Sequence, residues 1–120
     1  MLFRSQDDGL AELERAVAAS QRSPLWLSQL GEAYAMAGKT AQAREILAEL
    51  ERRSATEFVS PYHFAYVYTG LGDAEHAMDW LERAVAQRTG SAYGIKGSFL
   101  FVPLRTHPRF RTLLRQMNLE

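Results

Sequence analysis

Apolar side chains along this chain recur every three to four positions, which is the spacing of one face of an α-helix. The spacing is clear at Leu27, Leu30 and Tyr34, and again at Phe64, Val67 and Leu71. No run of β-branched residues alternates with polar ones as in a half-buried strand. The pattern therefore predicts an all-α protein. Helices are expected near residues 6–20, 24–37, 40–53, 61–71 and 74–88.

The pattern repeats with a period of 34 residues. This spacing separates Tyr34 from Tyr68, Gly38 from Gly72, Ala43 from Ala77, and Leu47 from Leu81. Ser23-Pro24 and Ser60-Pro61 each place an N-cap hydroxyl before a proline at the first helical position. Glycine tolerates the left-handed conformation that commonly ends a helix, so the two glycines are expected to stop the first helix of each unit. Each unit is thus predicted to be a helical hairpin.

The matched positions resemble the tetratricopeptide repeat (TPR) family, whose pattern has a 34-residue period. In the first unit they are Leu30, Gly31, Tyr34, Ala43 and Leu47, and in the second Phe64, Ala65, Tyr68, Ala77 and Leu81. The chain departs from the family at Leu27 and Pro61, where Trp is usual, and at Ala55 and Thr89, where Pro is usual. The resemblance covers about residues 6–90, or roughly two and a half repeats. It implies a solenoid of antiparallel helix pairs.

Residues 6–20 match the second helix of an earlier pair whose first helix is absent. Their apolar face, Leu10, Leu13 and Val17, is therefore expected to be under-covered and to favour self-association. Residues 1–5 look like a translated sequencing adapter, and we expect them to be non-native. Both observations suggest that the natural chain extended further upstream.

Residues 91–120 break the repeat and are expected to form a C-terminal capping segment. An irregular strap over 90–105 carries several apolar side chains, after which Thr106 is expected to cap a short helix. The apolar face of that helix is predicted to fold back near Trp80 and Leu81, and it consists of Phe110, Leu113, Leu114 and Met117. This ending is similar to the close of repeat domains at the C-termini of some bacterial signalling proteins.

Composition and charge narrow the partner classes. The chain has no cysteine, which excludes disulfides and thiolate metal sites. Basic and acidic residues balance at 14 each, although residues 91–120 carry +4 and the rest −4. Because the arginines of the tail alternate with its apolar residues, as an amphipathic cap requires, nucleic acid is a disfavoured partner. No apolar run approaches the ~20 residues of a membrane span, and the first residues given contain no hydrophobic signal core, so we expect a cytoplasmic protein.

The chain offers little for catalysis. His76 and Asp79 lie one turn apart but have no third ligand nearby, so no metal site is expected. Ser60, His63 and Asp73 include the residue types of a nucleophilic triad, but Ser60 is explained as a cap. Phosphate-binding glycine motifs are absent from the sequence. We therefore expect a protein that is not an enzyme and needs no cofactor.

The leading hypothesis for function is a scaffold that binds a protein or peptide segment. In the TPR family the first helices of successive pairs line a concave groove, and the matched positions are Leu25, Ser28, Glu32, Ala35, Met36, Val59, Tyr62, Tyr66 and Thr69. Tyr62 and Tyr66 are expected to be partly exposed anchors. The Lys, Arg and Asn with which chaperone-tail receptors clamp a carboxylate are missing there. The alternative is a structural, regulatory or dimerising C-terminal module of a larger bacterial signalling protein, without its own peptide ligand.

Overall fold

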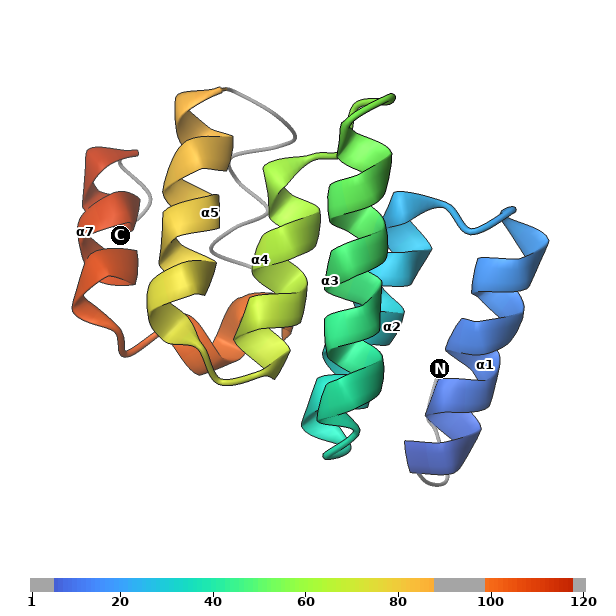
Figure 1. The fold of residues 1–120 in the computed structure, drawn as a ribbon. Helices are drawn as coiled ribbons and strands as arrows, with labels where there is room; N and C mark the ends of the chain where they lie inside the picture. The colour runs from blue at the N-terminus through green and yellow to red at the C-terminus, as the bar shows by residue number, and fades with distance from the viewer. Residues whose placement is uncertain (1–5, 88–98, 118–120) are drawn as a thin grey trace.

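The structure, a computed structural model, describes residues 6–87 and 99–117 and confirms the all-α prediction for them. These residues form six α-helices and one 3₁₀ helix, with no strand among them. The elements are α1 (Gln6–Ala19), α2 (Pro24–Met36), α3 (Thr40–Ser54), α4 (Pro61–Gly70), α5 (Ala74–Ala86), η1 (Phe99–Leu104) and α7 (Pro108–Gln116). Figure 1 shows the chain advancing across the molecule from α1 at one side to α7 at the other. The expectations for residues 1–5 and for the strap up to residue 98 lie outside the described residues.

The turns of the two central hairpins repeat at the level of individual hydrogen bonds. Gly38 and Gly72 both have positive φ, +83° and +76°, as predicted for helix-stopping glycines. The amide that follows each glycine donates to the carbonyl five residues earlier, from Lys39 to Tyr34 at 2.8 Å and from Asp73 to Tyr68 at 3.0 Å. The 34-residue period of the sequence is therefore also a period of the backbone geometry.

The starts of the two hairpins differ. Ser60 accepts a hydrogen bond from the Tyr62 amide at 3.2 Å, as expected of an N-cap. Ser23 occupies the N-cap position of α2, but its side chain makes no capping hydrogen bond, so that prediction was wrong. Because α4 begins later relative to its glycine, it has 10 residues where α2 has 13.

Small residues set the close approach of the helices. Ala43 and Ala77 are both fully buried. A Cβ added at Gly31 of α2 would lie 2.8 Å from a methyl group of Val67 on α4, too close for real atoms. The larger side chains around these contacts form a first core cluster, to which α1, α2, α3 and α4 all contribute. A second cluster joins α4, α5, η1 and α7.

The apolar face of α1 is better covered than expected. Leu10 and Val17 are buried in the first cluster together with Leu27 and Leu30 of α2, and Leu13 is partly buried against them. The prediction of an under-covered face was therefore wrong, because packing on α2 already buries Leu10 and Val17. This packing removes the stated reason for self-association through residues 6–20.

In the described part of the C-terminal segment, α7 packs near Trp80 and Leu81 as predicted. Phe110, Leu113 and Leu114 of α7 are buried in the second cluster with Leu81, and Trp80 and Met117 pack at its edge. The expected N-cap was wrong by one residue. His107 rather than Thr106 occupies that position, and its Nδ1 accepts from the Arg109 amide at 3.1 Å.

Candidate functional site

The candidate groove residues of α2 divide into two groups. Leu25 and Met36 expose 42% and 62% of their surface. Ser28 is fully buried, and its hydroxyl donates to the Leu25 carbonyl at 2.7 Å. Glu32 is only 3% exposed, and Ala35 is half-buried. Among the candidate groove residues of α2, Leu25 and Met36 at its two ends are therefore the ones that expose large apolar side chains.

The candidate residues around α4 are more deeply covered. Val59 and Thr69 are buried, and the Thr69 hydroxyl donates to the Ala65 carbonyl at 2.7 Å. Tyr66 is half-buried, as the prediction of a partly exposed ring requires. Tyr62 is only 8% exposed, so the same prediction was wrong for this residue. Its ring belongs to the second core cluster.

The 3₁₀ helix η1 covers this face of α4. The Phe101 ring lies 5.1 Å from the Tyr66 ring, centroid to centroid, at an interplanar angle of 33°. Phe101 and Leu104 are each 2% exposed and share the second cluster with Tyr62. The sequence showed these residues as apolar but gave no sign that they would occupy the positions expected to receive a partner.

Glu32 is an unusual buried carboxyl group. Among the described residues, no partner hydrogen-bonds to the Glu32 Oε1, and burial raises the pKa of this carboxyl group to about 8. Its helix also approaches α4 closely, since a Cβ at Gly70 would lie 2.7 Å from the Glu32 carbonyl oxygen. At neutral pH the carboxyl group is therefore mostly protonated, because the charged form would be poorly solvated.

Two further titratable groups lie on α4. The buried Nδ1 of His63 has no hydrogen-bond partner within the part of the chain that the structure describes, and burial lowers the pKa of this imidazole. The His63 ring is 6.3 Å from the Tyr66 ring. Burial, with the Glu32 charge as a second cause, raises the pKa of Tyr66. The His63 imidazole and the Tyr66 phenol are neutral at pH 7, so the face of α4 that bears them is polar but uncharged.

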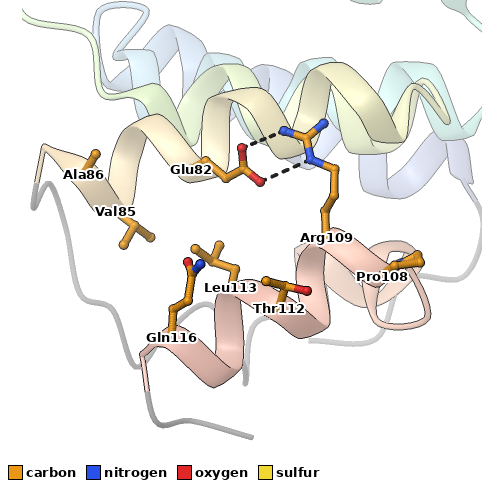
Figure 2. Close-up of a pocket in the computed structure, with 8 residues that line it drawn as sticks. All are labelled: Glu82, Val85, Ala86, Pro108, Arg109, Thr112, Leu113 and Gln116. Atoms are coloured by element: carbon orange, nitrogen blue, oxygen red, sulfur yellow. Dashed lines mark hydrogen bonds and ion pairs between the residues drawn. The ribbon is translucent and has the colours of Figure 1, made fainter.

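A network of ion pairs joins α7 to α5. The Arg109 guanidinium lies 3.0 Å from Glu75, 2.8 Å from Asp79 and 2.6 Å from Glu82. Figure 2 shows Arg109 reaching across to Glu82 at one end of an open groove, with Val85 and Leu113 lower down. Since all three carboxylates are already engaged by Arg109, this network is explained by the docking of α7.

A recess that the sequence did not suggest lies between the α3–α4 turn and α5. Phe58 is 71% exposed beside it, and Phe64 stacks on Trp80 with ring centroids 4.2 Å apart. The Arg83 guanidinium lies 4.3 Å from the centre of the Trp80 ring. The sequence signal that could have indicated this recess is Phe58, an aromatic residue in the loop between two predicted helices.

The two residues that sequence spacing had paired as possible metal ligands, His76 and Asp79, have different partners in the structure. His76 contacts Asp73 at 2.7 Å, while Asp79 is held by Arg109. Within residues 6–87 and 99–117, no three His, Cys, Asp or Glu side chains are placed to hold a metal ion. The helices of these same residues include none with the length and apolar character of a membrane span.

Comparison of the chain with protein-family models, with curated proteins and with solved structures finds no match.

Proposed function

We propose that this protein is a non-enzymatic scaffold of the TPR type, which binds an apolar segment of another protein in the groove of its first-in-pair helices, at the positions of α2 that stay exposed. The observation that carries the proposal is the exposure of Leu25 and Met36 on α2. Because eleven residues are close to three helical turns, these two side chains lie on the same side of α2. Both occupy positions that line the groove in the TPR family.

The repeated hairpin supports the TPR assignment. Two units share a 34-residue period, a glycine with positive φ and the same hydrogen bond across the turn. A stack of similar hairpins supplies a rigid surface, which lowers the entropy lost when a partner segment binds. On this view the cytoplasm remains the proposed location.

Selection from a displayed library of random peptides tests the proposal. Peptides that the parent chain enriches are measured against the double variant Leu25→Ser with Met36→Ser, and against Phe58→Ser as a control. Because all three side chains are exposed, none of the changes should lower the free energy of unfolding by more than about 0.5 kcal/mol. The double variant should weaken binding at least tenfold, or about 1.4 kcal/mol.

Two results would contradict the proposal. One is that the library yields no peptide that binds the parent chain. The other is that binding survives in the double variant and is lost in Phe58→Ser, which would move the interaction surface to the recess beside Trp80. With no binding peptide at all, a structural module of a larger protein becomes the better account.

A further inference from the structure

We infer that the recess between the α3–α4 turn and α5 binds a second copy of this chain, with Phe58 of each copy entering the recess of the other. This surface is separate from the α2 positions of the proposed function, and the inference does not rest on them. Figure 1 shows the end of α3, the start of α4 and the end of α5 at the same end of the molecule, and the recess lies among them.

The recess and the side chain that would fill it belong to the same surface. Val59, Pro61 and Phe64 line the recess and are buried, and Phe64 stacks on Trp80. Phe58 also lines it but is 71% exposed, the most exposed large apolar side chain of the described residues. Two copies therefore offer each other an uncovered aromatic ring and an apolar place to bury it.

The charged side chains that line the recess are divided by sign between its two sides. Glu51 of α3 and Glu57 of the α3–α4 turn lie on one side, and Arg83 of α5 lies on the other. Glu57 already pairs with Arg53 at 3.1 Å. Glu51 and Arg83 are both exposed, and within the described part of the chain neither has an ion-pair partner. A surface with opposite charges on its two sides is complementary to a second copy of itself.

A two-fold axis running along the recess satisfies both features. It brings the α3 side of one copy opposite the α5 side of the other, so Glu51 of each copy meets Arg83 of the second copy. The Arg83 guanidinium is already held 4.3 Å from the centre of the Trp80 ring. A guanidinium that lies over a ring keeps its in-plane N–H groups for a carboxylate. Because a two-fold contact is reciprocal, Phe58 is buried twice.

Sedimentation equilibrium of the parent chain tests the inference. A contact of this size is small, so the dimer should dissociate with a constant on the order of 100 µM, and the measurement covers about 10 µM to about 1 mM. The mean mass should rise toward twice that of one chain. Phe58→Ser should stay monomeric, while the control, Leu25→Ser with Met36→Ser, should dimerise like the parent chain. A parent chain that stays monomeric, or a dimer that survives Phe58→Ser, would overturn the inference.

A mixture of two charge-reversed variants tests the pairing across the axis. Glu51→Arg and Arg83→Glu each place like charges opposite one another, so either variant alone should dimerise about tenfold more weakly than the parent chain. In an equal mixture the first variant supplies two arginines and the second two glutamates, so both contacts join opposite charges again. The mixture should therefore dimerise about as strongly as the parent chain. Such recovery cannot come from contacts within one chain, and a mixture that stays monomeric would overturn the inference.

A segment of a different protein is the competing occupant of the recess. It predicts that the library selection yields peptides whose binding is lost in Phe58→Ser, while the parent chain stays monomeric at about 1 mM in the sedimentation experiment. That pair of results would overturn the inference. Dimer formation depends on Phe58 and peptide binding at α2 depends on Leu25 and Met36, so failure of the dimer leaves the proposed function standing.

Discussion

Helices α2 and α4 occupy equivalent places in two 34-residue units, yet they present different surfaces. Leu25 and Met36 of the first unit are exposed, while of their counterparts Val59 is buried and Gly70 is half-buried. Val59 is buried in the first core cluster, and Gly70 lies against the backbone of Glu32. Equivalent positions in a repeat therefore share backbone geometry without sharing exposure.

The difference follows from what the chain places next to each helix. Ser28 and Glu32 of α2 correspond to Tyr62 and Tyr66 of α4. The two tyrosines meet η1, a segment that belongs to no repeat. A period in the sequence predicts the framework of the hairpins, but the available surface depends on the segments that flank them. The following predictions test this comparison.

The largest effect is expected from Glu32, whose counterpart in α4 is a tyrosine. Its pKa is about 8 in the folded chain and near 4.5 when unfolded, so the folded state binds more protons between these values. The free energy of unfolding should therefore fall as pH rises, by up to about 1.4 kcal/mol per pH unit. Glu32→Gln should remove this slope.

Chemical denaturation between pH 6.5 and 8 is the suitable measurement. The lowered pKa of His63 acts in the opposite direction, because it adds stability as pH rises through about 6.5, so the Glu32 part is the difference between the parent chain and Glu32→Gln. That part is about 1.6 kcal/mol across the window, since a group with a pKa of about 8 is half ionised at pH 8. Glu51→Gln, on the exposed face of α3, is the control and should keep the slope. A flat profile in the parent chain would show that Glu32 is solvated or paired.

The next effect concerns Gly70 and its counterpart Met36. A Cβ at Gly70 would lie 2.7 Å from the Glu32 carbonyl oxygen and 2.9 Å from its Cα, and backbone atoms do not yield as a flexible side chain does. Gly70→Ala should cost about 1–3 kcal/mol through overpacking, despite the better helix propensity of alanine. Met36→Ala should change stability by less than about 0.5 kcal/mol. Equal melting temperatures for the two variants would contradict the close crossing of α2 and α4.

The acidic stripe of α5 has no counterpart in α3. Glu75, Asp79 and Glu82 correspond to Ala41, Glu45 and Ala48, so only α5 can hold Arg109. Arg109→Ala should lower the free energy of unfolding by about 1 kcal/mol, because exposed pairs are weak singly and add in a network. The loss should shrink in 1 M salt, which screens charges beyond about 3 Å. Arg44→Ala, on the exposed surface of α3, is the control; an equal loss there would argue against the network.

The sequence predicted the five helices before residue 88 and both glycine turns because local signals determine them. Helical periodicity and glycine conformation depend on neighbouring residues alone. Exposure was predicted less well, as Tyr62 and the face of α1 show, because contacts between distant segments decide it. The sequence indicated the link between Arg109 and α5 only in part, through the positive charge of residues 91–120 and the negative charge of the rest of the chain. The carboxylates at 75, 79 and 82, which fall on one helical face, were the overlooked signal.

The smallest predicted effect separates the two Ser-Pro helix starts. Ser60 accepts a hydrogen bond from the Tyr62 amide, one of the amides that a helix leaves without an intrahelical partner. Ser60→Ala should therefore cost about 1 kcal/mol. The Ser23 side chain makes no such bond, so Ser23→Ala should lie within about 0.5 kcal/mol of the parent chain. Thermal unfolding of both variants in one buffer gives the comparison. If the Ser23 variant lost as much stability as the Ser60 variant, its hydroxyl would have to cap α2 in solution, and the two helix starts would be equivalent after all.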